Sequence, residues 1–128
     1  MTPQFLAWLI DNWARTEPYI KAAVDRADGA FDLNYAWDEI IRGKAQFWPG
    51  ARCAIITKIE QHPSGIKSVL GWLTGGDDLD EIATIEARIA SWAKESMGCT
   101  RAEIIGRRGW ARALPGYREQ ATLLVKDL

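Results

Sequence analysis

The spacing of hydrophobic residues changes near residue 45 and divides the chain into two parts. Before that point, apolar residues recur every three or four positions, which is the period of an amphipathic helix. We expect a second helix capped by Thr16, with Pro18 in its first turn and Gly29 at its end, because proline is tolerated where a helix starts. A third, short helix is expected after Asp32 or Asn34. The first helix places on one face Phe5, Trp8, Leu9 and Trp13.

From residue 45 the pattern is typical of strands. AQFW, ARCAIITKIEQ and IKSVLGWLT are rich in β-branched and aromatic residues. The turn signals Pro49-Gly50 and HPSG separate them. Because these turns are short, we expect the three strands to form an antiparallel meander.

The strongest helical pattern in the chain follows, over residues 79–97. Asp77 or Asp78 is expected to cap it, and Gly98 to close it. A further strand (TRAEIIG), a short helix (RGWARAL) and a last strand (ATLLVKDL) are expected after it. The apolar stripe of the long helix consists of Leu79, Ile82, Ile85, Ile89, Trp92 and Ala93.

This order of elements predicts one α/β (α+β) domain over residues 1–128. Residues 1–44 form its N-terminal helical part, and residues 45–128 its sheet core. A strand–helix–strand connection after a meander gives a mixed β-sheet with helices on both faces.

Composition excludes several classes of function. The net charge of −1 favours neither nucleic acid nor an acidic partner. Cys53 and Cys99 have no CxxC spacing, and His62 is the single histidine, so no metal site is expected. We interpret the cysteines as buried, reduced thiols and His62 as a solvated turn residue. No signal peptide and no membrane-spanning run of about 20 apolar residues is recognisable.

The glycine pair Gly75-Gly76 stands between a strand and the long helix, where many proteins hold a phosphate on backbone N–H groups. Asp77 and Asp78 follow at once, and a carboxylate there satisfies the same donors and repels an anion. The sequence therefore favours a capped helix over a phosphate-binding loop.

The chain has one basic cluster, GRRGWAR. Arg107 and Arg108 precede a helix start and could hold a phosphate or carboxylate. The interpretation we favour is that they pair with Asp77, Asp78 or Asp80 across a cleft.

Four segments resemble a known family: FWPGARCAIIT, GWLTGGDDLDEI, IEARIASWAKESMGC and IIGRRGWARALPGY. Over roughly residues 45–128, their order resembles the GCN5-related N-acetyltransferase (GNAT) fold. In detail they are similar to small GNAT-like proteins encoded by tailed phages and prophages. For such proteins the resemblance implies a GNAT-like fold and, in some cases, packaging in the virion with no shown enzymatic role.

The chain departs from GNAT enzymes where they bind acetyl-CoA. Those enzymes hold its pyrophosphate on a Q/R-x-x-G-x-G/A loop, whereas the run from Leu73 to Asp78 lacks the basic or amide residue and the glycine spacing. We therefore expect no cofactor. The candidates that remain for acetyl-CoA are Gly75, Gly76, Arg107 and Arg108.

The resemblance also implies a tyrosine on the short final helix, where many GNAT enzymes protonate the departing thiolate. RGWARAL carries none, and Tyr117, the aromatic of a Gly-aromatic pair, is expected to be packed. Glu60 and Glu103 are candidate general bases, although each is also typical of an exposed strand residue. No catalytic residue is expected.

The sequence therefore favours a phage- or prophage-encoded GNAT-like protein with a degenerate acetyl-CoA loop, acting as a non-catalytic interaction or virion-associated protein. Its partner would be a protein, such as another virion component, and its location the bacterial host cytoplasm and the virion. The alternative is an acetyl-CoA-dependent N-acetyltransferase with an atypical cofactor site that uses Arg107 and Arg108. A third interpretation is an anion- or nucleic-acid-binding module built on GRRGWAR.

Overall fold

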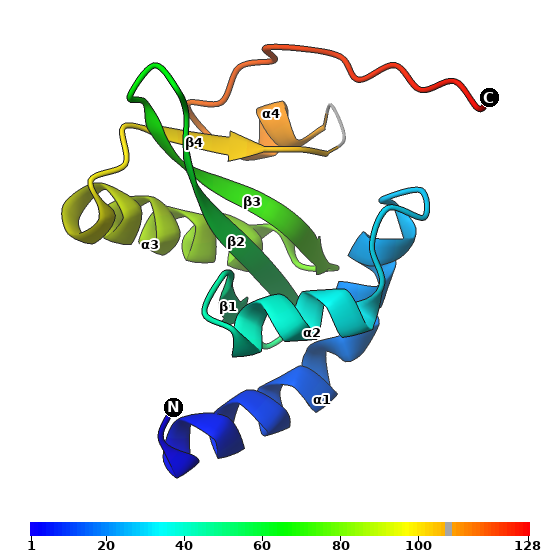
Figure 1. Ribbon diagram of the computed structural model, residues 1–128, viewed down its shortest axis with the longest axis vertical. Helices are drawn as coiled ribbons and strands as arrows, with labels where there is room; N and C mark the ends of the chain where they lie inside the picture. The colour runs from blue at the N-terminus through cyan, green and yellow to red at the C-terminus, as the bar shows by residue number, and fades with distance from the viewer. Residues whose placement is uncertain (107–108) are drawn as a thin grey trace.

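The computed structural model describes residues 1–106 and 109–128. The elements follow in the order α1 (Pro3–Asp25), α2 (Leu33–Ile41), β1 (Gln46–Pro49), β2 (Cys53–Gln61), β3 (Lys67–Gly76), α3 (Leu79–Met97), β4 (Arg101–Ile104) and α4 (Trp110–Ala113) (Figure 1). The result is a mixed α+β fold that begins with a long helix.

The strands form one sheet in the order β1-β2-β3-β4. The first three are antiparallel neighbours, which confirms the predicted meander, and β4 runs parallel to β3. A register shift lies between Ile56 and Thr57 on β2. Since α3 connects β3 to the parallel strand β4, the sheet is mixed.

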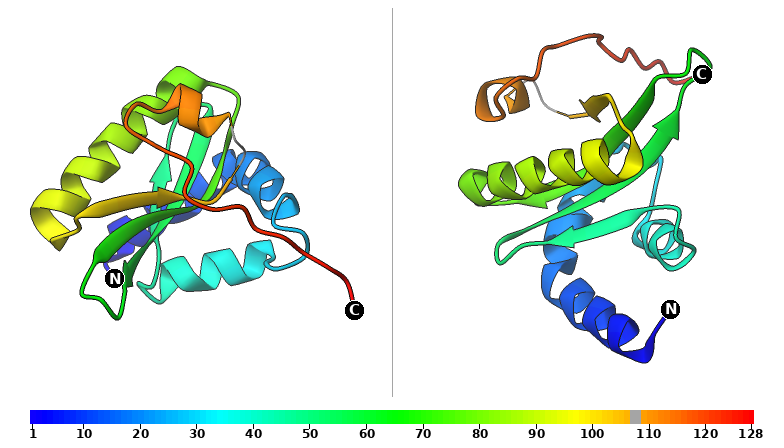
Figure 2. Two further views of the ribbon diagram at one scale, coloured as in Figure 1. Left: turned by 90° about the horizontal axis from the view of Figure 1, so that it is seen from above. Right: turned by 90° about the vertical axis from the view of Figure 1, so that its left-hand side faces the viewer.

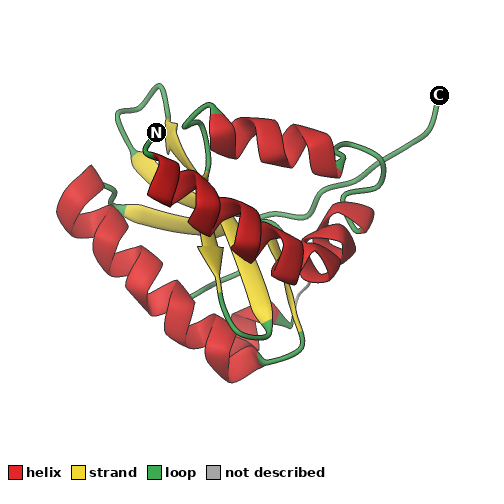
Figure 3. Cartoon of the chain, turned by 90° about the horizontal axis from the view of Figure 1, so that it is seen from below, coloured by secondary structure: helices red, strands yellow, loops and turns green. Residues whose placement is uncertain are grey.

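Helices cover both faces of the sheet, as predicted (Figures 2 and 3). On one face, α1 and α2 pack against strand residues such as Ile56 and Leu73. On the other, Ile82 and Ile89 of α3 pack against residues such as Ile55. The alternation of strand side chains between faces divides the apolar core into these two layers.

The helix boundaries follow capping chemistry. Asp32 and Asp78, each one of two predicted alternatives, accept a hydrogen bond from the backbone N–H three residues on, at 2.7 and 3.1 Å. Thr2 caps α1 in the same way. Gly98 ends α3 with a φ of 70°, the left-handed conformation that glycine adopts without strain.

The predicted helix start at Thr16 is wrong, because α1 continues through both Thr16 and Pro18. The buried Thr16 hydroxyl donates to the Asn12 carbonyl at 2.7 Å, a bond within the helix. Figure 1 shows that α1 bends midway, as expected of a helix with an internal proline. Leu9 and Ile20, on either side of the proline, are buried in the same core, so packing holds the two halves in one helix.

The predicted last strand is also wrong. Residues 121–128 run extended and form no strand (Figure 1, red). Leu123 and Leu124 are 81% and 87% exposed, because this segment neither pairs with a strand nor packs on the core. Leu79, at the start of α3, was predicted to belong to the apolar stripe of this helix. It is 58% exposed and lies outside the buried part of the stripe.

Within residues 1–106 and 109–128, no helix combines the length and the apolar character that crossing a bilayer requires.

Candidate functional site

The end of β3, where the chain turns toward α3, carries two of the candidate residues for acetyl-CoA. Gly75 and Gly76 are the last residues of β3 and lie opposite Ala54 and Cys53 of β2. The glycine pair therefore belongs to the sheet.

The backbone approaches other chain segments closely at both glycines. A Cβ on Gly75 would overlap the backbone oxygen of Tyr19 in α1. Gly76 has a φ of 153°, and a Cβ there would overlap the side chain of Cys53. These contacts explain both glycines by close packing, without a ligand.

The acidic residues after the glycines have partners within the chain. Asp78 caps α3, as described above, and thereby occupies one N–H donor in the first turn of this helix, that of Glu81. The Asp77 carboxylate forms an ion pair with the Arg52 guanidinium at 3.1 Å. The backbone N–H of Asp77 donates to the Arg52 carbonyl at 3.2 Å.

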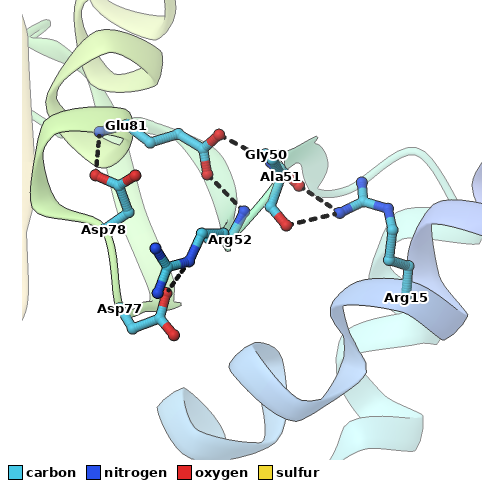
Figure 4. Close-up of polar contacts among 7 residues, drawn as sticks. All are labelled: Arg15, Gly50, Ala51, Arg52, Asp77, Asp78 and Glu81. Carbon is cyan, nitrogen blue, oxygen red and sulfur yellow. Dashed lines mark hydrogen bonds and ion pairs between the residues drawn. The ribbon is translucent and has the colours of Figure 1, made fainter.

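Glu81, in the first turn of α3, binds the turn between β1 and β2. Its carboxylate accepts hydrogen bonds from the N–H groups of Ala51 at 2.9 Å and Arg52 at 2.7 Å (Figure 4). These donors, that of Arg52 first, hold the pKa of Glu81 below its ordinary value. Burial, with Glu81 beside the thiol, raises the pKa of Cys53 to about 12.

Arg15 of α1 binds the same turn from its carbonyl side. The guanidinium donates to the carbonyl oxygens of Gly50 at 2.6 Å and Ala51 at 3.3 Å (Figure 4). The turn is thus held by a carboxylate on its N–H groups and a cation on its carbonyls. The chain's own carboxylates thus take three backbone donors beside the α3 start, the N–H groups of Ala51, Arg52 and Glu81, which an anionic ligand could otherwise use.

The parallel strands β3 and β4 pair over a short length only, Ser68–Gly71 with Arg101–Ile104. Beyond Gly71, β3 pairs with β2 alone in the described part of the chain. On the α3 side of this parting lies an apolar crevice with about 20 Å³ of open space, enough for roughly one water molecule. Its lining includes Val69, Ile82, Ile89, Trp110, Leu114 and Tyr117.

Tyr117 packs in this crevice, as predicted, and its hydroxyl donates to Glu86 of α3 at 2.8 Å. Burial, followed by the Glu86 carboxylate, raises the pKa of Tyr117. The hydroxyl therefore stays protonated.

The remaining candidate residues form two groups, one outside the described part of the chain and one within it. Arg107 and Arg108, and their predicted pairing with the loop acids, lie outside the described residues. Glu60 and Glu103 are brought together with His62, with ligand atoms within 4.8 Å of one another. His62 lies in the turn between β2 and β3, as predicted, but it is only partly exposed and its ring contacts strand residues, so it is not a freely solvated side chain.

Sequence patterns did not predict a partly buried charge pair on the α2 face. Lys58 of β2 donates to Glu39 of α2 at 2.8 Å, and its ammonium lies 4.0 Å from the centre of the Trp72 ring. The Lys58 bond is the main cause of a lowered Glu39 pKa. The one sequence signal for this pair is that Lys58, an ionisable residue, stands at a position of β2 that faces the core.

Comparisons of the chain with protein-family models, with curated proteins and with solved structures found no match.

Proposed function

We propose that this chain is a GNAT-like protein, encoded by a phage or prophage, that no longer uses acetyl-CoA and acts as a non-catalytic interaction or virion-associated protein. The order of elements supports this proposal. An antiparallel meander, a long helix, a parallel strand and a short helix follow in the predicted order, although the predicted last strand does not form.

The observation that carries the proposal is the closure of the β3–α3 loop by acidic side chains. Glu81 occupies the N–H groups of Ala51 and Arg52, while Asp78 accepts from the Glu81 N–H in the first turn of α3. A pyrophosphate placed there would meet carboxylates at short range, and like charges 4 Å apart cost about 1 kcal/mol even in water.

The crevice supports the same conclusion. With about 20 Å³ of open space, it would have to open substantially to accept the pantetheine arm of a coenzyme. The Tyr117 hydroxyl inside it is already bound to Glu86.

The N-terminal half of α1 supports an interaction role. Phe5, Leu6, Trp8 and Ile10 are between 38% and 51% exposed. Neighbouring apolar side chains on one helix are typical of a surface that binds another protein.

The alternative is an N-acetyltransferase with an atypical cofactor site. The parting of β3 from β4, and a protonated Tyr117 near it, favour this second candidate. In that case Arg107 and Arg108 would supply positive charge, and Tyr117 would be the proton donor.

Calorimetric titration and thermal unfolding with acetyl-CoA separate the two candidates. A ligand at 100 times its Kd stabilises the folded state by about 2.7 kcal/mol. We expect neither heat of binding nor a shift in Tm at millimolar acetyl-CoA. Micromolar binding, together with acetyl transfer that Tyr117→Phe reduces, would overturn the proposal in favour of the enzyme.

Mass spectrometry of purified particles of the encoding phage tests the virion association. We expect this chain in the particles at a fixed ratio to structural proteins. Presence only in the soluble fraction of the host would refute that part of the proposal.

A further inference from the structure

Glu60, His62 and Glu103 converge on the sheet face that also carries α1 and α2. Glu60 lies opposite Ser68 on β3, and Ser68 lies opposite Arg101 on β4. His62 and Glu103 are each two positions along from these residues, so their side chains emerge on the same face. The ligand atoms of the three residues all lie within 4.8 Å of one another, and we name these residues the Glu-His-Glu cluster.

The spacing in this cluster suits a metal ion. His62 Nε2 lies 3.5 Å from Glu103 Oε1. Two ligand atoms at the usual distance from Zn²⁺, about 2.0–2.2 Å, lie roughly 3.3–3.6 Å apart in tetrahedral geometry. All three side chains are partly buried and stand on or next to strands, so little ordering is needed on binding.

Glu60 points independently to a cation. Among the described residues, none forms a hydrogen bond or ion pair with its carboxylate. A second carboxylate, that of Glu103, lies beside it. Two neighbouring carboxylates repel each other unless a cation lies between them.

Ser68 and Arg101 define the surroundings of the cluster. The fully buried Ser68 hydroxyl lies 3.2 Å from His62 Nε2 and donates to Glu103 at 3.4 Å, which positions both ligands. Arg101 Nη1 lies 3.6 Å from Glu103 Oε1 and competes with an incoming ion for that oxygen.

We propose that the Glu-His-Glu cluster binds a divalent transition-metal ion, Zn²⁺ or an ion of similar preference, through one imidazole nitrogen and two carboxylate oxygens. This proposal departs from the sequence-based expectation of no metal site and does not depend on the proposed function. The nitrogen ligand favours Zn²⁺ over Mg²⁺ and Ca²⁺, which prefer oxygen alone. Three protein ligands leave a coordination position open to water.

The single histidine makes the test direct, because every imidazole NMR signal comes from His62. The ¹⁵N-labelled full chain is titrated with ZnCl₂ while the imidazole nitrogens are observed, and calorimetry gives the affinity. We expect saturable binding at a 1:1 ratio with a shift of Nε2. Glu60→Gln and Glu103→Gln should each weaken binding about tenfold or more, and Arg101→Gln should strengthen it.

The matched control is Glu95→Gln, an exposed glutamate on α3 whose replacement should leave the affinity unchanged. Thermal unfolding in EDTA checks that each variant folds, and Glu60→Gln should match or exceed the wild-type Tm because it removes an unpaired charge. No Nε2 shift at millimolar Zn²⁺ would overturn the proposal. So would binding that survives both glutamate substitutions, or binding without an Nε2 shift, which would point to the cysteines.

Discussion

Replacing Glu81 with glutamine should destabilise the fold by about 2 kcal/mol, because its carboxylate joins the start of α3 to the β1–β2 turn through two backbone donors. A hydrogen bond to a charged group contributes about 1.5–3 kcal/mol to stability when it is sheltered. Glu81 is partly exposed, which favours the lower end, and glutamine keeps one acceptor oxygen. For a domain of this size the Tm should fall by roughly 6–8 °C.

The assay is urea and thermal unfolding followed by circular dichroism at neutral pH. Asp80→Asn is the matched control, since Asp80 is an exposed acid in the same helical turn whose side chain forms no hydrogen bond or ion pair with a described residue. Its loss should cost less than about 1 kcal/mol, the contribution of the helix dipole alone. A Glu81→Gln change of less than about 0.5 kcal/mol would refute the assigned role of the carboxylate.

The pH dependence gives a second check on Glu81. Its pKa is lower in the folded chain than in the unfolded chain, so its stabilisation is complete above the unfolded pKa of about 4.3. The contribution is lost as the pH falls through the folded pKa. The stability gap between wild type and Glu81→Gln should therefore stay constant near neutral pH and shrink in acid, and a gap that widens in acid would contradict the reasoning.

Three other predictions use different parts of the fold. Gly75→Ala should lower stability by about 1–3 kcal/mol in urea unfolding, because its Cβ would overlap the Tyr19 backbone, whereas Gly109→Ala, with open space around it and a φ of −58°, should be neutral or stabilising. Cys53 should resist iodoacetamide at pH 8 in the folded chain and react in denaturant, because burial raises its pKa to about 12; mass spectrometry of the labelled peptide measures this, and rapid native labelling would contradict it. Deleting residues 121–128 should leave the Tm unchanged, because the segment is exposed; a clear drop would show that it pairs with the sheet after all.

Local signals predicted the elements whose boundaries depend on local chemistry. Asp78 and Gly98 bound α3 as expected because capping involves only residues within one turn. The meander was also predictable, since its turns are short and its strands are neighbours in the sequence. The helix start predicted at Thr16, with Pro18 in its first turn, was wrong because tertiary packing on both sides of the proline overrides the local signal for a helix break.

The site depends on contacts between distant segments, which a single sequence does not show. Glu81 is an ordinary first-turn glutamate until the fold places the Ala51–Arg52 turn beside it. Likewise, Glu103 reaches His62 only because β4 pairs with β3 in one particular register. The tail at 121–128 has the composition of a strand but pairs with none, and composition cannot supply a hydrogen-bonding partner.

The parallel attachment of β4 sets an order of assembly. The meander strands are close in sequence, so their pairing closes small loops, whereas β4 can pair with β3 only across the 19 residues of α3. We expect the meander to form early in folding and β4 to dock late. By the same reasoning β4 should open first in the native state, with amides that exchange with deuterium sooner than those at the centre of β2. A metal ion bound by His62 and Glu103 would therefore stabilise the attachment of β4, the part of the sheet that local unfolding opens first.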